Sequence, residues 1–151
     1  MHTDALITTV TELCTQLGFP VERVTVTEGA RTVVAVTLAG ADALMLTGQE
    51  GEPLRALNTV AHRILEHRYK DETPVFLVDV NGFHEQRLEK VRASVRVLAQ
   101  RARLFKDTIA LEPMNAYERL VIHEMFATDP EIETRSEGEG KMRHIVLKYR
   151  Q

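Results

Sequence analysis

Residues 112–123 read EPMNAYERLVIH, and this stretch decides how the C-terminal half is read. Asn115, followed three residues later by Glu118, resembles a capping box with Asn in the capping role. A helix is therefore expected to begin there and to run to about Ala127. Arg119 and His123 lie four residues apart, and this spacing puts the guanidinium and the imidazole on one face of the expected helix.

Arg119 and His123 form the first candidate site. Arg can bind phosphate bidentately, and a neutral His can stack or donate one hydrogen bond, but an Arg and a His four residues apart do not identify a ligand by themselves. The residues alone leave an alternative open, in which Arg119 pairs with a nearby carboxylate and His123 packs against the preceding long helix.

That long helix and the strands around the pair follow from apolar spacing. Leu88, Val91, Val95 and their continuation to Phe105 predict a helix over residues 84–105. We expect a short strand over 108–112, and a closing strand pair over 132–136 and 142–149 around the turn at 137–140. Residues 84–106 hold seven basic side chains against two acidic ones, a local net charge of +5, which predicts a phosphate-facing surface or a solvated helix face.

The N-terminal half gives a second series of elements. Apolar spacing and turn residues predict a helix over 4–17, a hairpin around 28–30, a short helix over 41–47, a helix over 52–68 and a strand over 75–80. Residues 1–80 carry 6 Lys and Arg against 11 Asp and Glu, a net charge of −5, whereas residues 81–151 carry 13 against 11, a net charge of +2. Asn81-Gly82 is the expected boundary, so the predicted domains are residues 1–80 and 81–151.

Between the two helices of the N-terminal half lies Gly48-Gln49-Glu50-Gly51, the second candidate site. Glycines let a nucleic-acid backbone approach the chain closely. The acidic residues Glu50 and Glu52 would repel phosphates, with a cost on the order of 1 kcal/mol for like charges in water. The alternative is a Gly-rich helix junction that serves packing or dimer contacts.

Both halves resemble known families. The order of elements around Gly48-Gln49-Glu50-Gly51 resembles a type II KH domain over residues 4–80. The Arg119 and His123 pair, with EPMN before it and TRSEGEG at 134–140 after it, resembles the R-three-H domain of bacterial Jag (KhpB) proteins over residues 79–151. Those proteins commonly carry an N-terminal domain as well, whereas this sequence starts at the KH-like helix, so we expect that domain to be lacking.

The resemblance implies an RNA-binding regulator that is often paired with a single-domain KH protein. It implies that Arg119 and His123 engage single-stranded nucleic acid and that the loop at residues 48–51 clamps a strand. Further candidates for the same basic surface are Arg135, Lys141, Arg143 and Arg87.

Composition excludes several other classes. The chain has 151 residues, 44% of them hydrophobic and 27% charged, with no apolar run long enough for a membrane span and no signal peptide, so a cytoplasmic location is expected. Cys14 is the only cysteine and predicts a small buried residue, not a disulfide or a thiolate zinc site. No P-loop or Gly-x-Ser-x-Gly turn occurs, and His62 and His67 would point about 140° apart on a helix. We therefore expect no enzyme, metal or cofactor.

Together these observations predict an α+β protein. The first domain is expected to be KH-like with the order α-β-β-α-α-β, and the second a small R-three-H domain with the order α-β-α-β-β. The expected function is binding of single-stranded RNA, with single-stranded DNA as a further possible ligand. The alternative is a protein-interaction module in which the acidic KH-like half forms a homodimer, or a heterodimer with a KH protein, and does not bind RNA.

Overall fold

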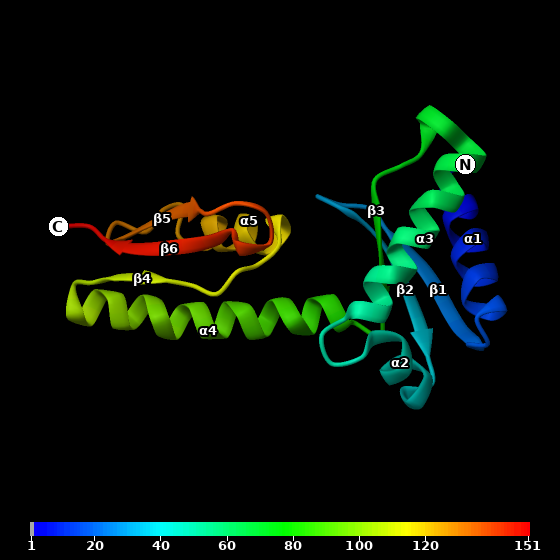
Figure 1. The fold of residues 1–151 in the computed structure, drawn as a ribbon, viewed down its shortest axis with the longest axis horizontal. Helices are drawn as coiled ribbons and strands as arrows, with labels where there is room; N and C mark the ends of the chain where they lie inside the picture. Colours follow the sequence, from blue (N-terminus) through cyan, green and yellow to red (C-terminus); the bar gives the residue numbers. More distant parts are fainter. Residues whose placement is uncertain (1) are drawn as a thin grey trace. The chain divides into compact units, whose positions relative to one another are not determined.

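The computed structural model describes residues 2–151, and the chain forms two compact units (Figure 1). The first unit ends at Glu85, and the second spans Gln86–Gln151. Each unit has its own hydrophobic core, a three-stranded sheet and helices, so the predicted α+β class is confirmed. No helix within residues 2–151 has both the length and the apolar character that crossing a membrane would require.

The first unit has the predicted α-β-β-α-α-β order. Strand β2 pairs with β1 in antiparallel and with β3 in parallel orientation, so β2 is the central strand. A parallel pair needs a crossover, which α2 and α3 provide. The elements are α1 (His2–Gln16), β1 (Val21–Thr27), β2 (Thr32–Leu38), α2 (Gly40–Thr47), α3 (Glu52–Tyr69), the short 3-10 helix η1 (Lys70–Glu72) and β3 (Phe76–Val80).

The core of this unit follows from the periodicity of its sequence. Helix α1 contacts both α3 and the sheet, and the apolar stripe of each helix meets alternate residues of β2 and β3. Cys14 lies in this core, as predicted, and burial raises the pKa of its thiol. The largest fully buried side chains of this unit are Leu6, Val10, Leu54, Leu65, Val34, Val36, Val78 and Val80.

Side chains of α3 cover the outer edge of β3. The Asn58 side-chain amide donates to the carbonyl of Val78 at 2.9 Å, and its oxygen accepts from the amide N–H of Val78 at 2.7 Å. The His62 ring lies 2.9 Å from the carbonyl oxygen of Phe76 and stacks on the Phe76 ring. The carbonyl of Phe76 and both backbone groups of Val78, which an uncovered edge strand would expose, therefore have partners within the unit.

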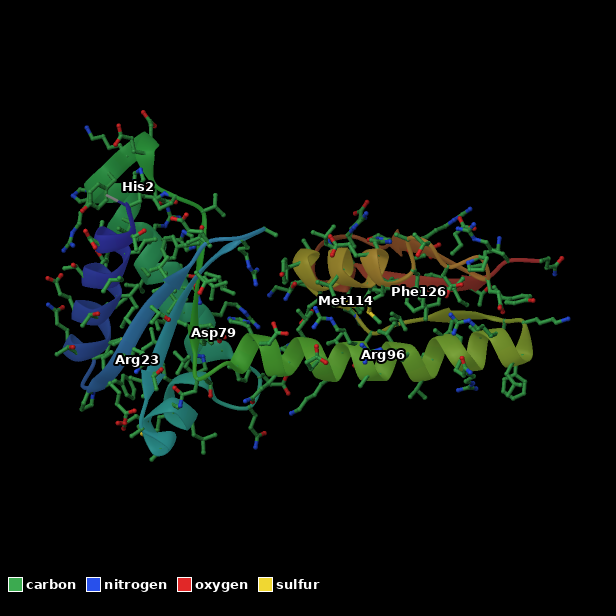
Figure 2. The ribbon with its side chains drawn as sticks, turned by 180° about the vertical axis from the view of Figure 1, so that it is seen from behind. His2, Arg23, Asp79, Arg96, Met114 and Phe126 are labelled. Carbon is green, nitrogen blue, oxygen red and sulfur yellow. The ribbon has the colours of Figure 1, made fainter. Side chains whose placement is uncertain are left out.

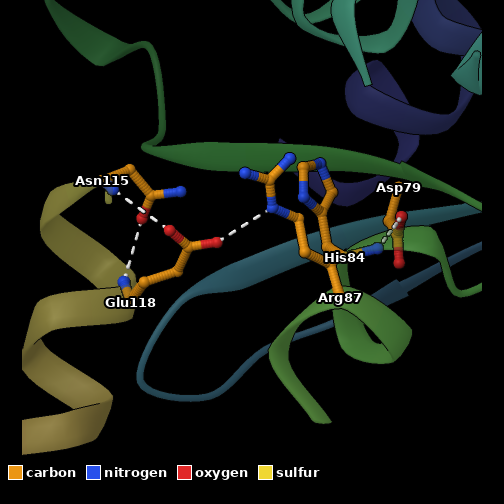
Figure 3. Close-up of polar contacts among 5 residues, drawn as sticks. All are labelled: Asp79, His84, Arg87, Asn115 and Glu118. Atoms are coloured by element: carbon orange, nitrogen blue, oxygen red, sulfur yellow. Dashed lines mark hydrogen bonds and ion pairs between the residues drawn. The ribbon is translucent and has the colours of Figure 1, made fainter. Parts of the chain in front are cut away.

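The turn after β3 is built by Asp79 and Asn81. Asn81 adopts a left-handed conformation, with φ of 49°, and its side chain brackets the backbone of Leu38 with two hydrogen bonds of 2.9 and 3.0 Å. Asp79 is buried and accepts a hydrogen bond of 3.0 Å from the backbone N–H of His84, in the first turn of α4 (Phe83–Phe105) (Figure 3). Asp79 therefore caps the start of α4. The predicted division at residues 80 and 81 stays a prediction.

The second unit contains the rest of α4 and a sheet in the order β4-β6-β5, with both pairs antiparallel. Residues of α4, α5 and the sheet form one apolar core, which includes Ala99, Ile122, Ile132, Ile145 and Leu147. The remaining elements are β4 (Thr108–Ala110), α5 (Ala116–Met125), β5 (Ile132–Glu137), the 3-10 helix η2 (Gly140–Met142) and β6 (His144–Tyr149).

Two predicted strand limits in this unit are wrong. The last strand begins at His144 instead of Met142, because Gly138 and Gly140 have φ of 85° and 57° and turn the chain into η2 before the ladder resumes. Strand β4 ends at Ala110 instead of residue 112. The chain nevertheless stays beside β6, since the Leu111 N–H donates to the Ile145 carbonyl at 2.8 Å.

Candidate nucleic-acid interface

Helix α5 begins with the predicted capping box, which is confirmed. The Asn115 side chain accepts a hydrogen bond from the Glu118 N–H at 2.9 Å, and the Glu118 carboxylate accepts one from the Asn115 N–H at 3.1 Å (Figure 3). Glu118 is only 4% exposed. Its second oxygen accepts a hydrogen bond of 3.1 Å from Arg87 Nε, which ties α5 to α4. The start of the helix that carries Arg119 and His123 is therefore fixed from two sides.

Arg119 is half-buried and points back along the chain. Its guanidinium donates to the carbonyl oxygen of Met114 at 2.7 Å. A guanidinium has five N–H donors, so this one bond holds the group in place and leaves donor capacity for a ligand. Within residues 2–151, no carboxylate pairs with Arg119. The structure therefore differs from the alternative raised by the sequence, in which a nearby carboxylate neutralises Arg119.

His123 is half-buried one turn further along the same helix. Its Nδ1 lies 2.7 Å from the hydroxyl oxygen of Thr134 in β5. This contact with a residue of the sheet fixes the orientation of the imidazole ring. The other ring nitrogen, Nε2, takes no part in it. Arg119 and His123 are thus each held by one neutral group, from different segments of the second unit.

The loop between β5 and β6 is tied to Arg119 through Met114. The Met114 N–H donates to the carbonyl of Arg143 at 3.2 Å, while the Met114 carbonyl accepts from Arg119. The Arg143 guanidinium donates to the Gly138 carbonyl at 2.9 Å, and Lys141 is exposed in η2. A Cβ on Gly138 would lie 2.9 Å from the Met142 carbonyl oxygen, so only glycine fits there. The backbone of Arg143 therefore lies beside Met114, whose carbonyl holds the Arg119 guanidinium.

Arg135 is not brought together with His123. Successive residues of a strand point to opposite faces, so Arg135 leaves β5 on the face opposite to Thr134, which holds His123. The Arg135 side chain pairs with Glu133 at 3.1 Å, and this hydrogen bond, followed by the positive charge, lowers the pKa of Glu133. Arg135 therefore adds little net positive charge to the α5 face.

The basic side chains of residues 84–106 are less available to a ligand than their number suggests. Three of the seven pair with acidic residues, in the pairs Arg87–Glu118, Arg92–Glu89 and Arg103–Asp129. The other four are exposed, and none has an ion pair in the part of the chain that the structure describes: Lys90, Arg96, Arg101 and Lys106. At about 100° per residue, Lys90 and Arg101 share a face of α4 and Arg96 lies on another, whereas Lys106 follows the end of the helix with φ of 52°. A single phosphate-facing stripe along α4 is not formed.

The Asp129 partner of Arg103 also shapes the turn between α5 and β5. Burial by itself raises the pKa of Asp129, but hydrogen bonds from the N–H groups of Glu131 and Ile132, together with the Arg103 guanidinium, outweigh it. The pKa of Asp129 therefore lies below its ordinary value, so the carboxylate of the folded protein is charged near neutral pH.

The second candidate, at residues 48–51, joins α2 to α3 in the first unit. Gln49 and Glu50 are exposed, whereas Gly51 is buried. A Cβ on Gly51 would lie 2.7 Å from the Phe83 ring, and Gly51 has φ of 75°, so both space and backbone require glycine. Packing therefore accounts for Gly51, and the exposed tip of the loop carries the acidic Glu50. Its role in binding stays a prediction.

Sequence reasoning missed three residues that position the candidate site. Glu118 was expected only as part of the capping box. Its bond to Arg87 could not be predicted from local spacing, since the two residues lie 31 positions apart in the chain. Thr134 and Met114 carried no signal of their own. Thr134 holds His123 from a strand 11 residues away, and Met114 acts through its backbone carbonyl, which any residue type provides.

Comparison with known proteins shows which domain family and which relatives this chain is similar to. The family model of the R-three-H domain matches residues 86–149, which is nearly the whole second unit. The RNA-binding protein KhpB of Bacillus subtilis strain 168 is 33% identical over 129 residues, which cover 84% of this chain and 61% of that protein. The RNA-binding protein KhpB of Clostridium symbiosum is 32% identical over 112 residues, or 74% of this chain and 50% of that protein.

The KhpB of Lactiplantibacillus plantarum is more distant, with 27% identity over 106 residues. The chain thus spans between about one third and three fifths of the length of these three relatives. The matches to the first two relatives extend well beyond the R-three-H segment, and that segment coincides with the unit that holds Arg119 and His123. Residues 86–149 therefore match the R-three-H domain, and most of the chain is similar in sequence to KhpB proteins.

Proposed function

We propose that this protein binds single-stranded RNA through the face of α5 that presents Arg119 and His123, with Arg143 and Lys141 beside it. The observation that carries the proposal is the state of Arg119. Its guanidinium is held by a neutral carbonyl at 2.7 Å and, among residues 2–151, has no carboxylate partner. A cation that is oriented but not neutralised favours an anionic ligand.

The chemistry of the pair suits a nucleic-acid backbone. The free edge of the guanidinium would bind two oxygens of one phosphate, and the imidazole would donate a hydrogen bond to, or stack on, the adjacent nucleotide. Arg143 and Lys141 would meet the next phosphate along the strand. The names of the KhpB relatives support RNA as the nucleic acid, since those proteins are named RNA-binding proteins. The proposal assigns binding to the site and no catalytic step.

Titration of a labelled 10-nucleotide RNA by fluorescence anisotropy tests this site. Replacement of both Arg119 and His123 by Ala should weaken binding at least tenfold, because a charge-assisted hydrogen bond and a neutral one are removed, together about 1.4 kcal/mol or more. Arg23→Ala is the matched control, since Arg23 is an exposed cation on β1 in the first unit. Equal binding by the double variant and the control would overturn the proposed site.

A second function has one observation in its favour. Leu44 and Met45 are 67% and 70% exposed on α2, next to the loop at residues 48–51, and the first half of the sequence is acidic. Such an apolar pair is suited to a protein partner, either a second copy or a KH protein. Sedimentation at micromolar concentration separates the two functions. A monomer that binds RNA supports the first function, and a dimer that does not bind RNA supports the second. The cytoplasmic location and the identity of a partner stay predictions from the sequence.

A further inference from the structure

The second unit contains a cavity of about 370 Å³ between α4 and the segment that leads from β4 to α5. This volume falls in the range of sites for small ligands, about 300–1,000 Å³. The wall from α4 is formed by Arg87, Lys90, Val91, Ser94, Val95 and Leu98, and the opposite wall by residues 110–114 and Glu118.

We propose that this cavity accepts one nucleobase of the strand that the α5 face binds. The inference rests on the proposed function and names a second binding point for the same strand. Met114 links the two places: it lines the cavity, and its carbonyl oxygen holds the Arg119 guanidinium at 2.7 Å. Figure 2 shows Met114 in the segment between α4 and the sheet of this unit. A nucleotide bound at Arg119 would therefore have this cavity next to it.

The walls suit the faces of a base. Val91, Leu98, Leu111 and Met114 present apolar surface, and the polarisable sulfur of Met makes favourable contacts with aromatic rings. Lys90 lies at the rim, is exposed and, in the described part of the chain, has no ion pair. Its ammonium group is placed to meet the phosphate of the nucleotide whose base enters the cavity.

Glu118 gives the cavity a chemical preference. This buried carboxylate lines the cavity and accepts two hydrogen bonds, one at each oxygen, from Arg87 and from the Asn115 N–H. A carboxylate has about four acceptor positions, so capacity for a further donor remains. Adenine, cytosine and guanine offer exocyclic amino hydrogens, and Glu is a known acceptor for the cytosine amino group, whereas the one base donor of uracil is its ring N3–H. The cavity should therefore favour amino-bearing bases over uracil.

Nuclear magnetic resonance of the Met methyl groups in the full chain gives a direct test. We expect AMP to shift the Met114 methyl signal clearly, UMP to shift it less, and ribose 5-phosphate, which has the same anion but no base, to leave it in place. Equal shifts with AMP and ribose 5-phosphate would show that only the phosphate binds, and the inference would fail.

A pair of variants tests the same cavity on RNA. Ser94 is exposed and lines the cavity, so Ser94→Trp would fill it without disturbing the core, whereas Ala93→Trp adds the same bulk at a neighbouring position outside the cavity lining. Ser94→Trp should weaken binding of a 10-nucleotide oligoadenylate about tenfold, as expected when one base is no longer bound, and Ala93→Trp less than twofold. Equal affinities of the two variants would contradict a base site in the cavity.

The two proposals fail in different ways. If the Arg119 and His123 double variant loses oligoadenylate binding but Ser94→Trp keeps it, the cavity is not a base site and the α5 interface stands. If oligoadenylate binds equally to wild type and the double variant, the α5 interface itself is wrong, and the cavity inference falls with it.

Discussion

The ion pair between Arg87 and Glu118 should stabilise the second unit measurably, because only one of its partners can reach water. The Glu118 side chain is 6% exposed and the Arg87 side chain 40% exposed, with Nε and the carboxylate oxygen 3.1 Å apart. Arg87→Met removes the cation and leaves a buried carboxylate with one hydrogen bond fewer. Breaking a buried pair costs about 3–5 kcal/mol, and a half-exposed partner reduces this, so we expect about 1–3 kcal/mol.

Glu118→Ala removes two interactions at once. It loses the bond from Arg87 and the reciprocal bond of the capping box, whose removal costs about 1 kcal/mol by comparison with other caps. We expect a total loss of about 2–3 kcal/mol in the free energy of unfolding. Glu118→Gln is the matched variant, since Gln also completes a capping box, and it should lose about 1 kcal/mol less than Ala.

A double-mutant cycle in urea measures the pair itself. The amide signals of Ile122 and Leu147, both fully buried, report unfolding of the second unit, and those of Val34 and Val78 report the first. We expect a coupling energy of about 1–2 kcal/mol between Arg87→Met and Glu118→Ala, confined to the second unit. Additive losses, or equal losses in both units, would refute the view that this pair fixes α5 on α4.

Three further changes test other parts of the structure. Asn58→Ala leaves the N–H and carbonyl of Val78 without the partners that α3 provides and should lower the stability of the first unit by about 2–4 kcal/mol in urea unfolding, and an unchanged midpoint would contradict this. Gly51→Ala should cost about 1–3 kcal/mol, because the new Cβ would meet Phe83 at 2.7 Å and φ is 75°; a neutral effect would show that the loop relaxes freely. Asp129→Asn should destabilise the second unit at pH 7. Because the folded pKa of Asp129 is lowered, this difference should shrink as the pH falls below about 4, and a difference independent of pH would contradict it.

Periodicity and turn residues were sufficient to predict the order of elements in both units. The apolar stripe of α3, the alternation in β2 and the Asn115 to Glu118 spacing each depend on residues close together in the chain, and each was confirmed. The start of β6 was missed because two glycines with positive φ insert η2 into a segment whose apolar residues otherwise suit a strand.

The candidate site was predictable only in part. The four-residue spacing of Arg119 and His123 put both on one helix, but the groups that hold them come from segments that no local pattern connects to that helix. The net charge of residues 84–106 was also a poor guide to the binding surface, because it does not show which cations are paired. A count of +5 treats every cation as free, whereas Arg87 and Arg103 are paired with carboxylates of distant segments.

The salt dependence of RNA binding tests the central claim most directly. Each phosphate of a single strand that the protein no longer neutralises should reduce the slope of log K against log salt by about 0.7, so Arg119→Ala should give a smaller slope than wild type by about that amount. Arg23→Ala, on the first unit, should keep the wild-type slope. Identical slopes for Arg119→Ala and wild type would mean that this guanidinium does not touch the RNA backbone.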